Sequence, residues 1–252
     1  MVDRWPTGAA VRLRSIRGGA MLYDTSRAGN LDERWFDPQW WSQRGRLEYS
    51  SEGRGAALYI DTDERRLVLR HYRRGGMAAR ISADRYLWQG ASSTRSFAEW
   101  QLLYHLHQAA LPVPIPIAAC YRRRRWTYTA DLLIQRIDGV RSLATLLQIG
   151  SLSLTAWIAI GRCVRLFHTA GVCHADLNAH NVLLDESAAV WLVDFDRGRL
   201  RRPGFWCDGN LVRLRRSIEK TVQPLPPDRF SESDWVSLLD GYFAAAAPEA
   251  AV

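Results

Sequence analysis

The segment between residues 174 and 196 constrains the fold more than any other part of the chain. It reads HADLNAHN, then two apolar runs (VLL and VWLV) separated by a turn at Asp-Glu, and then Asp-Phe-Asp. Apolar runs that flank such a turn predict a β-hairpin over residues 182–193. Because a hairpin brings the chain back to its start, we expect Asn181 and Asp194 to lie close together, beside the loop that carries Asp176.

These three side chains fit the chemistry of phosphoryl transfer. That reaction needs a carboxylate that accepts the proton of the attacking hydroxyl, and oxygen ligands that hold a divalent metal against nucleotide phosphates. Asp176 suits the first role, and Asn181 and Asp194 suit the second. We therefore predict an enzyme with ATP and Mg²⁺ as cofactors, Asp176 as the catalytic base, and Asn181 and Asp194 as metal ligands.

The order of elements is β-rich and then α-rich, with a break near Asp138. Residues 1–45 are rich in Arg and Trp and are predicted to be irregular. Extended runs are predicted within 46–74, at 117–129 and at 131–137, with the run Arg122–Arg125 as a hairpin turn. One clear helix, containing Phe97 and Trp100 at helical spacing, lies between them and ends before the proline-rich LPVPIP. Further helices are predicted at about 143–149, 154–169, 208–221 and 231–246.

Several of these strings resemble a known superfamily. HADLNAHN and the following Asp-Phe resemble the catalytic loop and the metal-binding Asp-Phe-Gly of protein-kinase-like enzymes. LRHYRRGG, LPVPIPIAA, HADLNAHNVLLD and VDFDRGRLR are similar to one branch of them, the 3-deoxy-D-manno-octulosonic acid (Kdo) kinases of Gram-negative bacteria. The resemblance implies transfer of phosphate from ATP to the 4-hydroxyl of a Kdo residue on a lipid A precursor, in lipopolysaccharide core biosynthesis.

The resemblance also implies the fold. We expect an α+β, bilobal protein-kinase-like fold, with an antiparallel β-sheet N-lobe that has one main helix and a reduced, mainly helical C-lobe. The predicted domains are 1–137, an N-terminal extension with the nucleotide-binding lobe, and 138–252, the catalytic lobe. Asp196 departs from the superfamily pattern because it replaces a glycine. It either adds a metal-directed oxygen or tolerates an unusual backbone angle.

The N-terminal half contains candidate nucleotide-binding residues. Gly53 and Gly55 lie between two predicted strands, where backbone amides can cover phosphates, although a plain hairpin turn has the same pattern. Arg70 ends the LVLR strand where a protein kinase has a lysine. The single lysine of the chain, Lys220, lies far downstream, so Arg70 is the fitting cation. Its guanidinium can still pair with phosphate.

Two further assignments depend on the stronger motifs. Glu99, on the main helix, is predicted to form an ion pair that orients Arg70. The alternative is that Ser96 and Glu99 form a capping box at the start of the helix. The run DLLIQRI occupies the position of a kinase hinge strand, where main-chain groups of Gln135 to Ile137 would bind adenine.

Composition restricts the partners. The formal net charge is +8, and 33 of the 34 basic residues are arginine, which favours an anionic partner such as phosphate, carboxylate or phospholipid. No apolar run approaches the roughly 18 residues of a membrane-spanning helix. The four cysteines form no CxxC pair and are expected to be reduced thiols, and the histidines lack a zinc pattern. His168 and His174 are expected to support the catalytic loop by packing and hydrogen bonding.

The sequence can be interpreted in terms of three functions. The first is a Kdo kinase at the cytoplasmic face of the inner membrane, bound peripherally to the anionic membrane surface through Arg-rich stretches, with no obligate protein partner. The second is a related kinase with a soluble acceptor, such as a sugar, a metabolite or an antibiotic. The third is a non-catalytic nucleic-acid-binding module. The intact Asp176, Asn181 and Asp194 oppose the third, as does the lack of regular basic-aromatic interleaving, so we predict no nucleic-acid partner.

Overall fold

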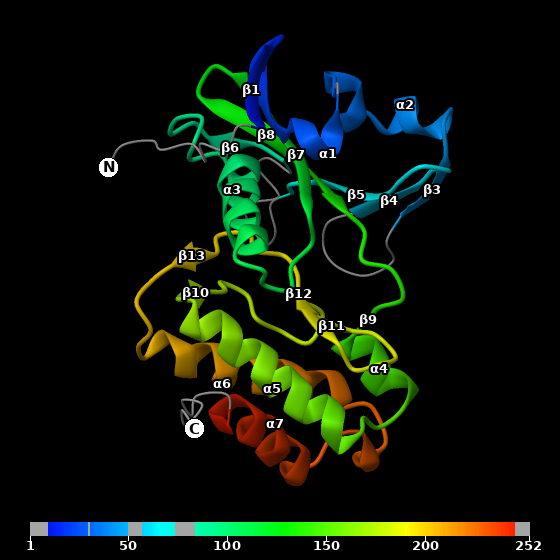
Figure 1. Cartoon of the computed structure of the whole chain (residues 1–252), viewed down its shortest axis with the longest axis vertical. Coiled ribbons are helices and arrows are strands. Elements are labelled where there is room, and N and C mark those ends of the chain that lie inside the picture. Colours follow the sequence, from blue (N-terminus) through cyan, green and yellow to red (C-terminus); the bar gives the residue numbers. More distant parts are fainter. Residues whose placement is uncertain (1–9, 30, 50–56, 74–83, 245–252) are drawn as a thin grey trace, which may run out of the picture. The chain divides into compact units, whose positions relative to one another are not determined.

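The computed structural model describes residues 10–29, 31–49, 57–73 and 84–244, and Figure 1 shows the course of the chain. The chain divides into two compact units. The first comprises residues 1–105 and 114–136, and the second comprises residues 106–113 and 137–252. The short segment 106–113 is part of the second unit, where the Pro112 carbonyl accepts a hydrogen bond of 3.1 Å from the Leu192 N–H.

An antiparallel sheet of eight strands is the centre of the first unit. Its order is β1-β2-β7-β8-β5-β4-β3, and β6 pairs with β8. The strands are β1 Val11–Ile16, β2 Gly19–Asp24, β3 Arg46–Tyr49, β4 Ala57–Asp61, β5 Arg66–His71, β6 Tyr86–Leu87, β7 Pro116–Arg124 and β8 Thr127–Gln135. Alternate residues of β4 and β5, such as Leu58, Ile60, Leu67 and Leu69, are buried, because successive side chains of a strand point to opposite faces. The predicted antiparallel sheet is confirmed.

The N-terminal region is more regular than we predicted. Residues 11–24 form the hairpin of β1 and β2, and they are followed by α1 (Thr25–Ala28), η1 (Glu33–Phe36) and α2 (Pro38–Ser42). Aspartate side chains just before each short helix accept hydrogen bonds from its first backbone N–H groups. Trp41 is buried, and its indole N–H donates to the Trp35 carbonyl at 2.8 Å. The expectation of an irregular segment was therefore wrong.

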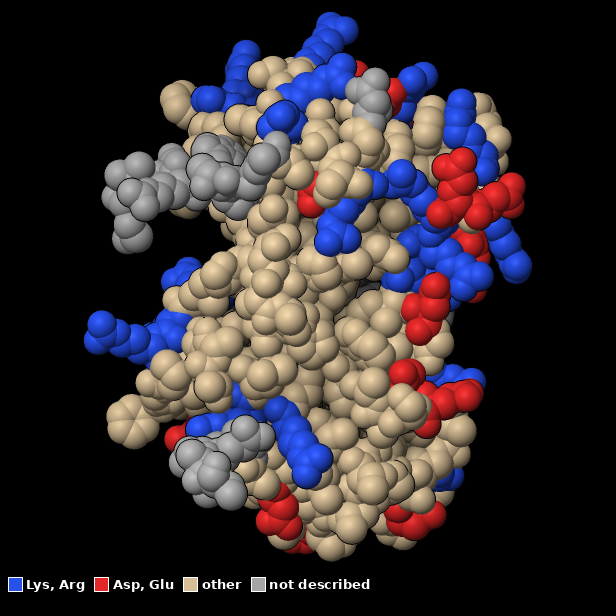
Figure 2. Space-filling model, viewed as in Figure 1, with Lys and Arg blue, Asp and Glu red and all other residues tan. Residues whose placement is uncertain are grey.

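Strand β1 is an edge of the sheet, and it exposes Arg12, Leu13 and Arg14. Figure 2 shows arginine side chains, in blue, at the top of the view, where Figure 1 draws β1. An edge strand with charged side chains resists pairing with the edge of another chain.

Helix α3 (Arg95–Gln108) lies mainly in the first unit, where its residues before position 106 pack on strand β7. Phe97 and Trp100 are fully buried, and the Phe97 ring lies 5.0 Å from that of Tyr121. The Ser96 hydroxyl donates to the Cys120 carbonyl at 2.8 Å. Ser96 is therefore inside the helix and bonded to the sheet, so the capping-box interpretation of Ser96 and Glu99 was wrong.

The second unit is mainly helical. Its helices are α4 Leu143–Ile149, α5 Leu154–Thr169, α6 Trp206–Val222 and α7 Glu232–Ala244, with η3 at Pro227–Arg229. Its short strands are β9 Arg141–Ser142, β10 Val172–Cys173, β11 Val182–Leu184, β12 Val190–Leu192 and β13 Arg199–Leu200. β11 pairs with both β9 and β12, and β10 pairs with β13. The hairpin predicted over residues 182–193 is confirmed, as are all four helices, except that residues 245–246 of the last one lie outside the described residues.

Helices α5 and α7 approach each other through two glycines. A Cβ on Gly161 would lie 1.9 Å from the Leu238 carbonyl oxygen, and one on Gly241 would lie 2.1 Å from that of Ile158. Both distances are too short for any side chain, so glycine at these two positions is what permits the close packing.

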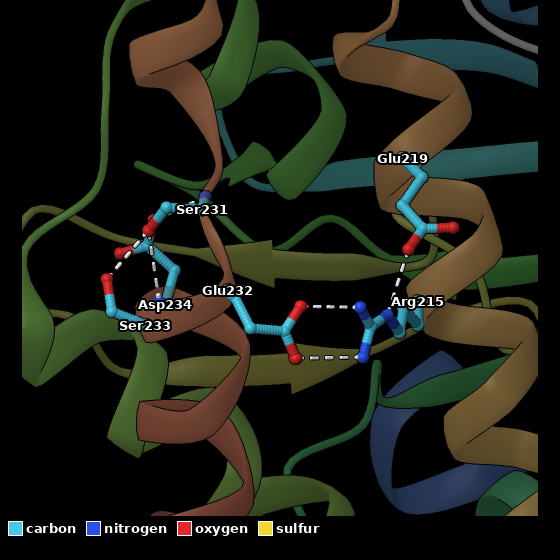
Figure 3. A network of polar contacts seen from close by, with 6 residues as sticks. All are labelled: Arg215, Glu219, Ser231, Glu232, Ser233 and Asp234. Carbon is cyan, nitrogen blue, oxygen red and sulfur yellow. Dashed lines mark hydrogen bonds and ion pairs between the residues drawn. The ribbon is translucent and has the colours of Figure 1, made fainter.

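Helix α7 begins with a capping motif, drawn in Figure 3. The Ser231 N–H donates to the Asp234 carboxylate at 2.8 Å, and the Asp234 N–H donates to the Ser231 hydroxyl at 3.3 Å. Each side chain satisfies a backbone N–H that lacks a helical partner. In the same view the Arg215 guanidinium of α6 binds both Glu232 and Glu219.

Candidate active site

The loop that carries Asp176 runs from β10 to β11 and is anchored by His174. The Asp176 N–H donates to Nδ1 of His174 at 3.1 Å, so the ring proton lies on Nε2, which donates to the Val193 carbonyl at 3.0 Å. Burial lowers the pKa of His174 and keeps the ring neutral. His174 thereby connects the Asp176 loop to the residue that precedes Asp194.

Asn210 supports this loop from α6. Its Nδ2 donates to the His174 carbonyl at 2.9 Å, and its Oδ1 lies 3.4 Å from Nε2 of His168. Nδ1 of His168 in turn lies 2.8 Å from the Tyr242 hydroxyl. Three helices therefore hold the loop through one chain of buried polar groups. The expectation that His168 and His174 support the loop is confirmed.

The Asp176 main chain is fixed, whereas its carboxylate faces solvent. The Asp176 carbonyl accepts hydrogen bonds from the side chains of Asn178, at 3.0 Å, and Asn181, at 2.8 Å. The Asp176 side chain is 65% exposed. A carboxylate in this position is accessible to a hydroxyl substrate, and hydrogen bonds hold the backbone that carries it.

The β11–β12 hairpin brings the backbones of Asn181 and Asp194 together, as predicted. Val182 is paired with Leu192, and the Val193 N–H donates to the Asn181 carbonyl at 3.1 Å. Nδ2 of Asn181 donates to the Asp176 carbonyl, which leaves Oδ1 as the oxygen that can bind a metal. An amide oxygen and a carboxylate are hard oxygen donors that suit Mg²⁺, which completes its shell with water and phosphate oxygens. The residues present thus fit the cation.

The Asp-Phe-Asp segment has a defined geometry. Phe195 is fully buried, with its ring 4.8 Å from that of His174 and 5.7 Å from that of Phe167. Positive φ angles occur at Asp194 (62°) and Arg197 (60°). The unusual backbone angle that we considered for Asp196 therefore falls on its neighbours, and that interpretation was wrong.

In the first unit, Arg70 and Glu99 form the predicted ion pair. The Tyr72 hydroxyl joins them, since it accepts from Nη2 of Arg70 at 3.0 Å and donates to Oε2 of Glu99 at 2.5 Å. Glu99 is buried, and the Arg70 side chain is 21% exposed. Burial, together with the Glu99 charge, raises the pKa of Tyr72 well above its usual value, so the phenol stays protonated and can donate.

The other predicted nucleotide-binding residues are less well defined. Gly53 and Gly55 lie outside the described residues. The Gln135 N–H donates to the Ile115 carbonyl at 2.8 Å, and the Arg136 N–H donates to the Arg66 carbonyl at 2.9 Å. The N–H groups of Gln135 and Arg136, two of the main-chain groups predicted to bind adenine, are thus bonded within the first unit.

Sequence reasoning missed two residues of this machinery. Tyr72 follows Arg70 by two positions at the end of β5, so its side chain is on the same face, a spacing that could have identified it. Asn210 is a polar residue on the buried side of α6, among Cys207, Leu211 and Leu214. A buried polar side chain needs partners, which is the signal that could have drawn attention to it.

A solvent-facing carboxylate on a loop next to a hairpin with an amide and a carboxylate at its ends is an arrangement that suits the transfer of a phosphoryl group from a nucleotide. With an antiparallel sheet unit and a reduced helical unit, the molecule is a phosphotransferase of the protein-kinase-like class, which acts on a hydroxyl and uses ATP.

Comparison with known proteins specifies the family. The chain matches the lipopolysaccharide kinase (Kdo/WaaP) family over residues 38–242, and it belongs to that family. It is 48% identical, over 222 residues, to a 3-deoxy-D-manno-octulosonic acid kinase of Xanthomonas campestris pv. campestris (strain B100), covering 87% of this chain and 88% of the relative. A kinase of the same name from Xylella fastidiosa (strain M12) is 46% identical over 205 residues, covering 81% and 82% of the two chains. The predicted family is thereby confirmed.

Proposed function

We propose that this enzyme transfers phosphate from ATP to the 4-hydroxyl of a Kdo residue on a lipid A precursor, in lipopolysaccharide core biosynthesis. The observation that supports it most is the Asp176 loop next to the hairpin of Asn181 and Asp194, in a chain nearly half identical to kinases named for this sugar acid.

Each residue then has a role. Asp176 accepts the proton of the attacking hydroxyl. Asn181 and Asp194 would hold Mg²⁺, which supplies charge neutralisation at the nucleotide phosphates when it is bound. Within the first unit, Arg70 would bind nucleotide phosphate, and the buried Glu99 fixes its direction together with the Tyr72 hydroxyl.

The two predicted domains have different proposed roles. We assign nucleotide binding to residues 1–137, with Arg70, Gly53 and Gly55 on the phosphates and the main chain at Gln135 to Ile137 on adenine. We assign catalysis to residues 138–252. Within the adenine segment, the Ile137 N–H is the donor, because those of Gln135 and Arg136 serve the sheet.

We also propose that the enzyme acts at the cytoplasmic face of the inner membrane, as a peripheral protein. Its lipid-linked acceptor requires access to that surface. Among the described residues, no helix is both long enough and apolar enough to cross a bilayer. We therefore propose that charged side chains, together with side chains that prefer the membrane interface, attach the protein to the bilayer surface.

The surface that supports attachment lies at one end of the sheet in the first unit. The β1–β2 turn lies beside β7, since the Arg123 N–H donates to the Gly18 carbonyl at 2.7 Å. β6 lies beside the β7–β8 turn, since the Trp88 N–H donates to the Trp126 carbonyl at 2.9 Å. These contacts gather six side chains, which we call the hairpin-end surface: Arg17, Leu87, Arg123, Arg124, Arg125 and Trp126.

The chemistry of the hairpin-end surface fits an anionic membrane. Its arginines are exposed, and Trp126 and Leu87 are 78% and 67% exposed. Residues 10–23, 85–98 and 117–130, which supply the surface, contain no Asp or Glu. Tryptophan prefers the membrane interface, and arginine is attracted to anionic headgroups.

An acceptor panel tests the proposed function. Purified enzyme is incubated with ATP, magnesium and either Kdo-bearing lipid A precursors or soluble sugars and metabolites. We expect transfer to the Kdo-bearing lipids alone. Transfer to a soluble acceptor in preference to them would contradict the proposal and favour the soluble-acceptor kinase.

A further inference from the structure

Helix α6 presents one face to the Asp176 loop. Asn210 and Ser217 on this face both bond to the loop, Asn210 to the His174 carbonyl at 2.9 Å and Ser217 to the Ala179 N–H at 3.1 Å. Arg213 is three residues after Asn210 and four before Ser217, so helical spacing places it on the same face. Its Nη1 lies 4.0 Å from Oδ1 of Asp176.

The two side chains touch only loosely. The Arg213 side chain is 52% exposed and that of Asp176 is 65% exposed. At 4.0 Å the contact is longer than a hydrogen bond, and exposed ion pairs of this kind contribute little to stability. Protein stability therefore does not explain why an arginine lies beside the catalytic carboxylate.

Its neighbour Arg215 provides a contrast on the same helix. Figure 3 shows the Arg215 guanidinium between two carboxylates: Nη1 and Nη2 bind Glu232 at 3.2 and 2.6 Å, and Nε binds Glu219 at 2.9 Å. That arginine is a structural link between α6 and α7. Arg213 instead has a solvent-facing guanidinium whose planar fork can bind a carboxylate through two hydrogen bonds.

The proposed acceptor supplies that carboxylate. Kdo is a sugar acid, so at neutral pH it brings a negative charge to Asp176 along with the hydroxyl that is to react. Two like charges at one site repel each other, and a cation beside them offsets the repulsion. A guanidinium adjacent to the base can also fix the orientation of the sugar, because a bidentate pair has a defined geometry.

We propose that Arg213 is the residue that binds the carboxylate of the acceptor sugar and thereby selects a sugar acid. The inference rests on the proposed function, since it deepens the description of the same site. It assigns to Arg213 a role in acceptor binding, next to the catalytic role of Asp176.

The test combines a protein variant with a modified acceptor. Arg213→Gln and wild-type enzyme are assayed with the Kdo-bearing lipid and with the methyl ester of its Kdo carboxylate. Loss of a charge-assisted contact predicts a rise in acceptor KM of about 10- to 100-fold for Arg213→Gln, with ATP KM changed less than about 2-fold. Esterification should impair wild type by a similar factor and add little to the defect of the variant.

Arg216→Gln is the matched control. Arg216 is also exposed on α6, but it lines a groove of about 420 Å³ between α6 and α7, together with Val212, Glu219 and Trp235. It should leave the acceptor KM unchanged. Thermal unfolding of both variants would show that each is folded.

Two results would overturn the inference alone. The first is an acceptor KM for Arg213→Gln equal to that of wild type. The second is an unchanged acceptor KM with a loss of kcat that is the same for the Kdo-bearing lipid and for its methyl ester. That second result would place the guanidinium on the transferring phosphoryl group. If wild type failed to phosphorylate the Kdo-bearing lipid, the proposed function itself would fall first, and this inference with it.

Discussion

A cluster of three side chains, Arg70, Tyr72 and Glu99, joins strand β5 to helix α3. Glu99 is buried on α3, and Arg70 lies on β5 with Tyr72 just beyond its end. A buried carboxylate costs free energy unless a cation and hydrogen bonds satisfy it, and here both are present. The Arg70–Glu99 ion pair is therefore our candidate in the first unit for the group that orients a nucleotide phosphate.

If Glu99 orients Arg70, substitutions of the two residues should cause similar kinetic defects. Arg70→Ala should raise ATP KM and lower kcat. Glu99→Gln should reproduce most of that defect, by roughly 10-fold or more in kcat/KM, because the loss of one charged hydrogen bond is worth about 1.5 to 3 kcal/mol. Steady-state kinetics with varied ATP would measure both. A silent Glu99→Gln beside an inactive Arg70→Ala would mean that Glu99 does not orient the guanidinium.

His168 predicts a pH-dependent stability. Burial lowers its pKa to about 4, whereas the unfolded chain protonates histidine near pH 6.5. Between these values the unfolded state binds one proton more than the native state, so the free energy of unfolding falls as pH drops, by about 3 kcal/mol in total at most. Denaturant titrations at pH 7, 5.5 and 4.5 would measure it. His168→Gln should lose less stability over this interval than wild type, and an identical loss would contradict the assignment.

Residue-level prediction from the sequence succeeded where the partners were close along the chain. Asn181 and Asp194 are joined by one hairpin, whose turn and apolar runs are readable directly. Asn210 was not assigned, and Arg213 was predicted only as part of an Arg-rich stretch, residues 213–216, that could meet lipid phosphates and sugar carboxylates. Their contacts with the Asp176 loop arise when α6 packs beside it, so the sequence does not show which residues of the loop they meet.

At the scale of elements, the packing of α5 on α7 depends on Gly161 and Gly241. Gly241→Ala should reduce the free energy of unfolding by about 1 to 3 kcal/mol or more, because its methyl group would press on the Ile158 carbonyl. Gly209→Ala in α6 is the control. A Cβ there meets nothing within 4 Å, so alanine should stabilise the helix by about 0.5 to 1 kcal/mol.

Chemical denaturation of the two alanine variants and wild type would decide the matter. Destabilisation at Gly241 with none at Gly209 is the expected pattern. Equal effects at both positions would mean that helix propensity, and not the approach of the two backbones, governs these glycines.

The elements that were predicted well are those with local signals. Helix α5 has apolar residues at helical spacing and ends before Gly171, and the β11–β12 hairpin is defined by its turn. Strand β1 was missed because, as an edge strand, it buries none of its residues fully, and its pairing with β2 is what defines it. The strand limits predicted near the Arg122–Arg125 run were also wrong: β7 extends through Arg124, and the turn falls at Arg125, which has a φ of 55°.

At the scale of the whole molecule, the proposed attachment to the membrane predicts a salt dependence. Co-sedimentation with vesicles that contain anionic phospholipid should weaken as salt rises, because screening acts over about 8–10 Å at physiological ionic strength. Neutral vesicles should bind little. Binding that ignored both salt and lipid charge would contradict an electrostatic attachment.

Two double variants test which surface of the protein binds the membrane. Arg124→Ala/Arg125→Ala should weaken partitioning by about 30-fold, since each arginine near an anionic leaflet contributes about 1 kcal/mol. Arg162→Ala/Arg216→Ala removes the same charge elsewhere and should have a smaller effect. If the two double variants bound equally, net charge rather than the hairpin-end surface would be responsible.

The central claim is that Asp176 activates a Kdo hydroxyl for attack on ATP. Its most direct test follows labelled γ-phosphate from ATP to a Kdo-bearing lipid A precursor and maps its position by NMR, for wild type, Asp176→Asn and the exposed control Asp240→Asn. The account predicts phosphate on the 4-hydroxyl, turnover lowered about 100- to 10,000-fold in Asp176→Asn with ATP affinity nearly intact, and no change in Asp240→Asn. Phosphate on another group, or full activity in Asp176→Asn, would contradict it.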